Sequence, residues 1–311
     1  MTEMRFEDDV VIVTGAGRGL GREHALAFAA RGAAVVVNDV MDEAGGTSPA
    51  HDVAAEITAA GGRAVAVCGS VADPDGGVAI VKAALLAFGR ITILVNNAGV
   101  IDFAPLAQLS DSAWERMMSV TLDGTFNMTR AVWPHLVEQG HGRIVNTTSN
   151  AGFAGNETLV HYGAAKMGVA GFTRALAQEA AGTGITVNAI APMAVTRMNR
   201  DAFFGGADVQ ADDWQADIRA GRVPMGPPSI VSPTVLWLAH QSTTINGEIF
   251  SSSSGKVARV AFVVGKGHFD PDHSPEDLRD HADAIRSVGD AFEPTCTADE
   301  LMLIPLLFAP S

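Results

Sequence analysis

The sequence predicts an α/β fold: a doubly wound parallel sheet in a single domain, with a lid and a C-terminal extension. Apolar runs of strand length alternate with amphipathic or alanine-rich stretches of helix length through most of the 311 residues. Most of these runs are continuous in Val, Ile and Leu, which indicates strands covered on both faces. Strand–helix–strand units repeated in this way imply parallel strands joined by right-handed crossovers.

The individual elements follow from these runs in chain order. The strands are expected at Val10–Thr14, Ala34–Asp39, Ala64–Val67, Ile91–Val95, Arg143–Thr148, Ile185–Ile190 and Glu248–Phe250. The helices are expected at Gly19–Ala30, Asp52–Ala60, Asp73–Phe88, Asp111–Glu138, Val160–Ala181 and Ile230–His240. Helices placed between parallel strands can cover both faces of one sheet.

Composition excludes several classes of protein. A hydrophobic fraction of 47% excludes a disordered or fibrous chain. Lys+Arg number 21 against 35 Asp+Glu, and the net charge of −14 argues against nucleic acid and anionic membranes as partners. Cys68 and Cys296 are too few for a disulfide framework, and no apolar stretch reaches the roughly 18 residues of a membrane span. The first ten residues lack a signal-peptide pattern, so we expect a cytoplasmic protein.

Two segments depart from the alternation of strands and helices. Residues Ala191–Ser229 form a long connection rich in Gly and Pro that carries Phe203 and Phe204. We interpret it as a lid or binding loop, with a plain surface excursion as the alternative. The tail over residues 256–311 is too short for an independent domain of ordinary size. We therefore expect a main domain over residues 1–255 and an extension that packs on it or on a partner subunit.

The tail combines polar and apolar parts. Ser274 followed by Pro275 predicts the start of a helix. Four side chains of metal-ligand type lie close together in the sequence, namely His268, Asp270, Asp272 and His273. We interpret them as a solvated turn and expect no metal site. The apolar run Leu301–Phe308 needs cover, which the domain or a second subunit would provide.

The first strand runs directly into a glycine-rich turn and then a helix. The turn reads Thr14-Gly15-Ala16-Gly17-Arg18-Gly19-Leu20-Gly21. Glycines there allow a tight turn and the close approach of a diphosphate to backbone N–H groups at a helix N-terminus. The next strand ends in Asp39, 18 residues past Gly21, near the spacing at which a carboxylate binds the adenosine ribose. These features predict a Rossmann-type dinucleotide-binding fold.

Two side chains of this region bear on which dinucleotide binds. The Asp39 carboxylate would repel a 2′-phosphate, which favours NAD over NADP. Arg18 is the opposite signal, because a cation in the loop can pair with a 2′-phosphate. A solvated loop residue is the alternative interpretation of Arg18, and we expect NAD as the cofactor.

Further motifs accompany the glycine turn. They are Asn96-Asn97-Ala98-Gly99, Tyr162-x-x-x-Lys166, and Ser149 thirteen residues before Tyr162. The combination resembles the short-chain dehydrogenase/reductase family over roughly residues 6–255. Within that family, stretches such as FGRITILVNNAGV and HSPEDLRDHADAI are similar to the (3R)-hydroxyacyl-CoA dehydrogenase part of type 2 peroxisomal multifunctional enzymes.

The resemblance implies a set of site residues and an assembly. The catalytic residues would be Ser149, Tyr162 and Lys166. The cofactor would contact Gly15, Gly17, Arg18, Gly19, Leu20, Gly21, Asp39, Ser70, Val71, Asn97, Ala98, Gly99, Tyr162, Lys166, Pro192 and Thr196. A homodimer or homotetramer joined through the two long helices is also implied.

Three positions depart from the family pattern. Thr121 stands where the family usually has Asn, which puts the usual proton relay through that residue in doubt. Pro192 is followed by Met instead of the usual Gly. Ser70 and Val71 stand where an acidic residue commonly faces the adenine. None of these departures removes a residue that must react.

The three catalytic candidates suit the oxidation of an alcohol. Tyr162 is the only tyrosine, and because a phenol titrates near 10 it needs help to act as a base. Lys166 lies four residues further along the same predicted helix, within reach of Tyr162. Its ammonium group, with the positive nicotinamide, favours the phenolate. Ser149 can donate a hydrogen bond to the substrate oxygen as charge develops there.

We therefore expect NAD-dependent interconversion of a secondary alcohol and a ketone, with a small-molecule substrate. The narrower resemblance favours a (3R)-3-hydroxyacyl-CoA, a CoA thioester. The alternatives are a hydroxysteroid or steroid-side-chain acyl-CoA, NADP-dependent ketone reduction and, outside the enzymes, a cofactor-binding sensor or scaffold. A hydrolase triad of Ser149, His161 and a carboxylate is disfavoured, because the Gly-x-Ser-x-Gly elbow is absent.

Overall fold

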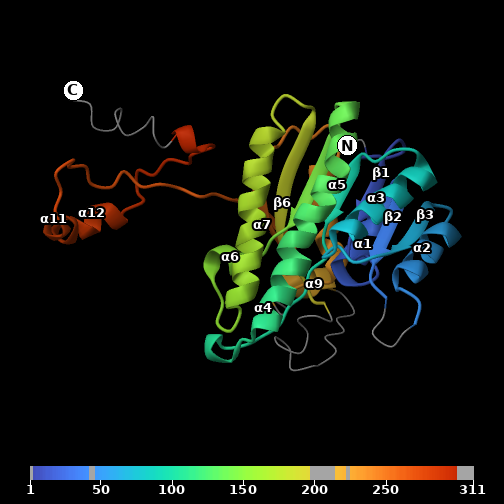
Figure 1. The fold of residues 1–311 in the computed structure, drawn as a ribbon, viewed down its shortest axis with the longest axis horizontal. Helices are drawn as coiled ribbons and strands as arrows, with labels where there is room; N and C mark the ends of the chain where they lie inside the picture. Colours follow the sequence, from blue (N-terminus) through green and yellow to red (C-terminus); the bar gives the residue numbers. More distant parts are fainter. Residues whose placement is uncertain (1–2, 42–45, 197–213, 222–224, 300–311) are drawn as a thin grey trace. The chain divides into compact units, whose positions relative to one another are not determined.

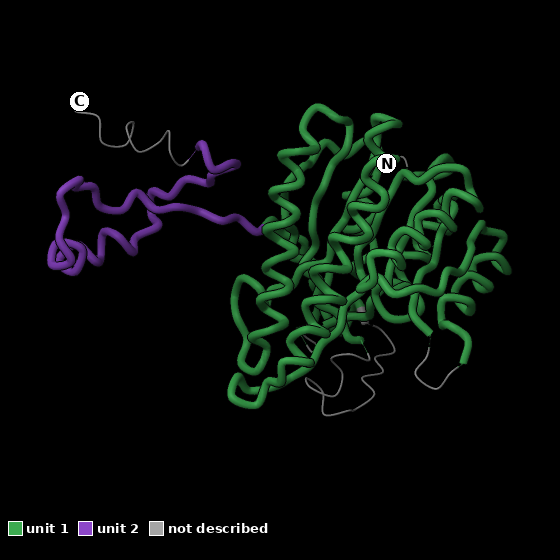
Figure 2. The backbone as a smooth tube through the Cα atoms, in the orientation of Figure 1, with its two compact units in different colours: residues 1–259 green, residues 260–311 purple. Residues whose placement is uncertain are grey.

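The computed structural model describes residues 3–41, 46–196, 214–221 and 225–299. The chain divides into two compact units, Met1–Arg259 and Val260–Ser311, shown in green and purple in Figure 2. The first unit holds the sheet and the helices that cover it (Figure 1).

One eight-stranded sheet organises the first unit. Its strands are β1 Val10–Val13, β2 Ala34–Asp39, β3 Arg63–Cys68, β4 Ile93–Asn96, β5 Gly142–Thr147, β6 Ile185–Met193, β7 Ile249–Ser253 and β8 Lys256–Val260. Their order is β3-β2-β1-β4-β5-β6-β7-β8, and the pairs from β3 through β7 are parallel. The chain winds outward from β1 in both directions, so the predicted doubly wound parallel sheet is confirmed.

The last strand, β8, was not expected. It follows β7 after Ser254 and Gly255, both of which have positive φ, 49° and 81°. Positive φ at both central residues suits the two-residue turn that joins neighbouring strands. The sequence feature that indicates β8 is therefore the short turn at Ser254 and Gly255, and not an apolar run of the kind used to predict the other strands.

The helices lie between the strands. They are α1 Gly19–Ala30, α2 Ala50–Ala59, α3 Pro74–Phe88, α4 Asp111–Met118, α5 Gly124–Gln139, α6 Asn150–Ala154, α7 Val160–Glu179, α9 Trp214–Arg219 and α10 Ser232–Ala239. Short 3-10 turns are η1 Leu106–Gln108 and η3 Pro228–Ile230. The helix expected over 111–138 is interrupted by a π-helical turn, η2 Ser119–Asp123. Such turns inside a helix are frequent at functional sites.

Alternating side chains of the strands bury both faces of the sheet. Val11 and Val145 join the cluster that includes Phe28 of α1 and Val235 of α10. The neighbouring Ile12 and Ile144 join the opposite cluster, with α3, α5 and α7. Because both faces are dry, strands of this sheet read as continuous apolar runs.

The second unit contains α11 Pro275–Asp280 and α12 Ala282–Arg286. Ser274 and Asp277 form a capping box, which begins α11 at the predicted place. Val264 and Phe292 form an isolated antiparallel bridge within this unit. The apolar run 301–308 and the lid residues 197–213, with Phe203 and Phe204, lie outside the described residues.

Candidate active site

The glycine turn between β1 and α1 closes tightly over the carboxyl end of β1. Gly15 and Gly19 have φ of 60° and 56°, in the left-handed region where only glycine is unstrained. A side chain at Gly21 would collide with the carbonyl oxygen of Gly15 and the amide of Asn97. The turn therefore needs glycine at these positions for its own geometry and for the packing of α1.

Asn97 and Ala98 brace the glycine turn from the end of β4. Thr14 Oγ1 accepts hydrogen bonds from the backbone N–H groups of Asn97 and Ala98, each at 3.0 Å. The Asn97 amide donates to the carbonyls of Thr14 and Gly15 at 2.9 and 3.0 Å. These bonds join two predicted cofactor segments that are distant in sequence into one wall.

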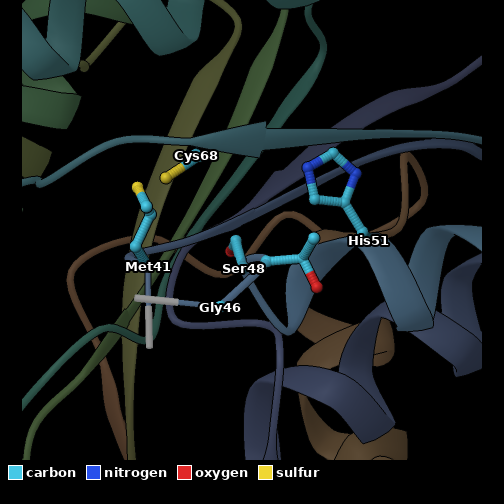
Figure 3. Close-up of a pocket in the computed structure, with 6 residues that line it drawn as sticks. Met41, Gly46, Ser48, His51 and Cys68 are labelled. Carbon is cyan, nitrogen blue, oxygen red and sulfur yellow. The ribbon is translucent and has the colours of Figure 1, made fainter. Parts of the chain in front are cut away.

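Asp39 lies at the end of β2 and faces the same turn. Its Oδ2 accepts a hydrogen bond from the Gly17 N–H at 2.8 Å. Beside it a hollow is lined by Met41, Gly46, Thr47, Ser48, His51 and Cys68 (Figure 3). Cys68 of β3 pairs in register with Asp39, so the hollow adjoins the carboxylate expected to bind the adenosine ribose.

Ser70 and Val71 follow β3, on the predicted adenine side. Ser70 Oγ accepts from the backbone N–H of Ala72 at 3.3 Å. Val71 is buried, and a side chain at Gly124 of α5 would lie 2.6 Å from its Cγ2. The side chain of Val71 is thus packed against α5.

The remaining cofactor candidates lie around the start of α1 and the end of β6. Arg18 is the N-cap residue of α1, and Leu20 packs partly buried against the hydrophobic core. A side chain at Gly19 would lie 3.8 Å from Cγ2 of Thr196. Pro192 belongs to β6. Because Thr196, just after that strand, approaches Gly19, the segment that follows β6 lies next to the glycine turn.

The three catalytic candidates come together at the ends of β5 and α7. Ser149 is the N-cap of α6, and its Oγ accepts from the Ala151 N–H at 3.2 Å. Tyr162 on α7 shares a side-chain hydrogen bond with Ser149. Lys166, one turn further along, has its Nζ 5.8 Å from the centre of the Tyr162 ring.

Burial controls the ionisation of this group. It raises the pKa of the Tyr162 phenol, and the hydrogen bond with Ser149 opposes that rise. Burial lowers the pKa of Lys166 to about 8. The Lys166 ammonium nevertheless has a partner, because Nζ donates to the carbonyl oxygen of Thr147 at 2.7 Å.

A buried amide network beneath the site was not expected from the sequence. Asn96 Nδ2 donates to Asn146 Oδ1 at 2.9 Å, and Asn146 Nδ2 donates to Thr173 Oγ1 at 2.9 Å. Thr148 Oγ1 donates to the carbonyl of Lys166 at 2.6 Å. The network sets β4, β5 and α7 against one another, and its only sequence signal is polar residues inside apolar strands.

Thr121 lies in the π-helical turn η2 and is buried. Its hydroxyl contacts Met117 Sδ at 3.7 Å, and its carbonyl accepts from Thr125 Oγ1 at 2.8 Å. A side chain at Gly99 would lie 3.4 Å from Lys166 Nζ and 3.8 Å from Thr121 Oγ1. The position that departs from the family pattern therefore borders Lys166, the predicted catalytic lysine.

Two other candidate chemistries find no support. His161 is fully buried, and neither ring nitrogen has a hydrogen-bond partner among the described residues, which disfavours a triad with Ser149. In the described part of the chain no three His, Cys, Asp or Glu side chains group as metal ligands. His268 instead stacks on His281, with ring centres 3.8 Å apart.

Comparison with known proteins agrees with this geometry. The short chain dehydrogenase family profile matches residues 9–203. Mouse peroxisomal multifunctional enzyme type 2 is 38% identical over 299 residues, and a Synechocystis 3-oxoacyl-[acyl-carrier-protein] reductase is 38% identical over 253 residues. A crystal structure of a Mycobacterium avium short chain dehydrogenase superposes with a TM-score of 0.78 at 36% identity, covering 91% of this chain and 98% of that one.

This chain belongs to the short-chain dehydrogenase/reductase family, and it is an oxidoreductase of the class that acts on CH–OH groups. The predicted family is thereby confirmed, as is the resemblance to type 2 peroxisomal multifunctional enzymes. The alignment with the mouse enzyme covers 94% of this chain but only 38% of that enzyme. The alignment with the Synechocystis reductase covers 80% of this chain and 96% of the reductase. Among the described residues, no helix has the length and apolar character that a membrane crossing requires.

Proposed function

We propose that this protein oxidises a secondary alcohol to a ketone with NAD, or catalyses the reverse reduction. The observation that carries the proposal is the group formed by Ser149, Tyr162 and Lys166 at the carboxyl edge of the parallel sheet. This edge, next to the point where the strand order reverses, is where ligands bind in open α/β folds.

The residues around the edge suit a dinucleotide. Gly15 packs closely on Ala98 and Gly21 on Asn97, and this tight turn leads into the N-terminus of α1, where a diphosphate would bind. Asp39 would accept hydrogen bonds from the adenosine ribose, and its charge disfavours a 2′-phosphate. We therefore favour NAD. An NADP-dependent ketoreductase is the alternative, and Arg18 is the residue that would favour it, because its cation can pair with a 2′-phosphate.

In the proposed mechanism each side chain has one task. When bound, the nicotinamide would supply the hydride acceptor. Tyr162 takes the proton from the substrate alcohol, and the nearby Lys166 ammonium favours the phenolate that does so. Ser149 donates a hydrogen bond to the substrate oxygen. Burial raises the pKa of Tyr162 and the hydrogen bond with Ser149 opposes that rise, so the proposed phenolate also needs the Lys166 ammonium nearby.

The substrate that we favour is a (3R)-3-hydroxyacyl-CoA. The support is the similarity to peroxisomal multifunctional enzyme type 2, together with the resemblance of stretches of this sequence to the (3R)-hydroxyacyl-CoA dehydrogenase part of such enzymes. A hydroxysteroid or steroid-side-chain acyl-CoA is the near alternative. The similarity to an acyl-carrier-protein reductase favours a third possibility, ketone reduction. A sensor that binds the cofactor without turnover is disfavoured by the complete catalytic group.

We also propose a homodimer or homotetramer in the cytoplasm. Phe126 of α5 and Phe172 of α7 meet edge to face, with ring centres 6.4 Å apart, on neighbouring helices (Figure 1). Phe126, Val137 and Met167 are exposed on these helices. A second copy of the chain would cover this apolar surface. Light scattering after size exclusion would measure the assembly.

The experiment that tests the function is reduction of NAD and of NADP, followed by absorbance. The panel contains (3R)- and (3S)-3-hydroxyacyl-CoA esters of several lengths and several steroid alcohols, with Tyr162→Phe as the background control. Turnover of the (3R) esters with NAD is expected. Turnover of steroid alcohols alone would keep the reaction and replace the proposed acyl-CoA substrate with a steroid. Cofactor binding without any turnover would support the alternative that the protein is a cofactor-binding sensor.

A further inference from the structure

Thr147, the last residue of β5, carries an unusual hydroxyl. Its side chain is buried, with an exposed fraction of 7%. Its Oγ1 has no hydrogen-bond partner in the described part of the chain. Each of the other buried threonines of the described chain has one, and the half-buried Thr186 is the other threonine whose buried hydroxyl lacks a partner. Because a buried hydroxyl without a partner is costly, native structures rarely keep one that no ligand or water satisfies.

The direction of this hydroxyl follows from the alternation of side chains along a strand. The side chains of Asn146 and Thr148 both bond to α7, through Thr173 and Lys166. Thr147 lies between them, so its side chain points to the opposite face of the sheet. Val145, two residues earlier, belongs to the core cluster on that face.

At this end of the strands, that face adjoins the glycine turn. Ala16 of the turn and Ala194 after β6 belong to the same cluster as Val145. Gly19 and Thr196 also approach each other there. The Thr147 hydroxyl thus lies beneath the region between the glycine turn and the segment after β6.

The backbone of Thr147 already takes part in the site. Its carbonyl oxygen accepts the hydrogen bond from Lys166 Nζ at 2.7 Å. Ser149 follows two residues later. One residue therefore holds the catalytic lysine through its backbone and presents a hydroxyl to the other side of the strand.

We propose that the Thr147 hydroxyl hydrogen-bonds to the nicotinamide end of the bound dinucleotide and so fixes the position of that end beside Tyr162. The inference rests on the proposed function. A hydroxyl both donates and accepts, so it suits the carboxamide and the hydroxyls of the adjoining ribose. The ligand would satisfy a buried hydroxyl that the described chain leaves without a partner.

The test compares Thr147→Val with Thr147→Ser, by calorimetric titration with NAD and with ADP, which lacks both the nicotinamide and its ribose. Val keeps the shape and removes the hydroxyl, whereas Ser keeps the hydroxyl. We expect Thr147→Val to bind NAD roughly three- to tenfold more weakly, the loss of one hydrogen bond. ADP binding should stay within about twofold, and Thr147→Ser should restore NAD binding.

Thermal unfolding of the free protein provides an independent readout. Because Val removes an unsatisfied buried hydroxyl, Thr147→Val should melt a few degrees higher than the wild type while binding NAD more weakly. Equal affinity of wild type and Thr147→Val for NAD would overturn the inference and leave the proposed function intact. Failure of the wild type to bind either NAD or NADP would instead overturn the proposed function, and the inference with it.

Discussion

The backbone N–H of Gly17 donates a hydrogen bond to Oδ2 of Asp39, 2.8 Å away across the mouth of the glycine turn. A side chain at Gly17 would lie 2.7 Å from the same oxygen. The carboxylate that is expected to bind the adenosine ribose is therefore held by the loop expected to bind the diphosphate. We therefore expect cofactor choice and loop conformation to depend on this one contact, and substitutions of Asp39 can separate the effect of its charge from that of its hydrogen bond.

Asp39→Asn removes the charge and keeps an oxygen that can accept from Gly17. We expect the ratio of NADP to NAD affinity to rise on the order of tenfold, because the repulsion of a 2′-phosphate is lost. Titration of both dinucleotides measures the ratio. Asp39→Ala is the companion variant, since it removes the loop contact as well. An unchanged ratio in both variants would show that Asp39 does not select the cofactor.

Tyr162→Phe should abolish proton transfer and leave the fold intact. The phenol is the proposed base, so we expect kcat to fall by roughly a hundred- to ten-thousandfold. NAD affinity should change little, and the circular dichroism spectrum should match the wild type. A rate close to that of the wild type would rule out this tyrosine as the base.

Gly21→Ala should destabilise the protein. The added methyl group meets the Gly15 carbonyl and the Asn97 amide, both of which are fixed by hydrogen bonds. A loss of roughly 3 kcal/mol in the free energy of unfolding is expected, measured by denaturant titration. Gly171→Ala in α7 is the control, because nothing lies within 4 Å of its added methyl group. That variant should gain roughly 0.5–1 kcal/mol, and similar effects at both sites would contradict the packing argument.

Stability should fall in mild acid because of His24. This residue of α1 is fully buried, and burial lowers its pKa from 6.5 to about 3. The unfolded chain takes up a proton below pH 6.5, whereas the folded chain stays neutral until about pH 3. Neutral His24 therefore makes its full contribution to the free energy of unfolding above pH 6.5. That contribution, on the order of a few kcal/mol, is lost as the pH falls from 6.5 toward 3.

His24→Asn provides the matched comparison for this titration. It keeps a polar partner for the Ser232 hydroxyl, which lies 2.8 Å from Nδ1, and it has no charge to gain. Unfolding free energies measured between pH 3.5 and pH 7 should therefore change less steeply in the variant. Parallel pH profiles would assign the acid sensitivity to other groups.

Thr121→Val tests the position that departs from the family pattern. Its hydroxyl has a sulfur at 3.7 Å as its hydrogen-bond partner in the structure, and its carbonyl bond to Thr125 does not need the side chain. We expect the unfolding free energy to change by less than about 1 kcal/mol and kcat by less than about threefold. A tenfold loss of kcat with normal NAD binding would instead assign the hydroxyl a part in proton transfer.

Local patterns in the sequence were enough to predict the parallel sheet, the glycine turn and the family. These features depend on residues close together in the chain: continuous apolar runs for β1 through β6, closely spaced glycines before α1, and Tyr162 one turn from Lys166. The assignment of roles to the predicted site residues stays a prediction. The spacing of these residues in the sequence indicates an alcohol dehydrogenation. It does not show which neighbours surround each side chain or how deeply the side chain is buried.

Only the tertiary structure decided which groups meet across large separations in the chain. The π-helical turn at Thr121 and the unpartnered hydroxyl of Thr147 carry no local signal. Polar residues inside apolar strands are the only signal of the bond between Asn96 and Asn146, and they do not say which residues pair. The physical reason is that hydrogen-bond partners and burial depend on which elements pack together, and a strand cannot specify its neighbours by its own pattern. The sequence alone determined the helices, the parallel strands and the family of this protein. The packing of those elements decided which polar side chains of the site have partners within the protein and which remain for a ligand.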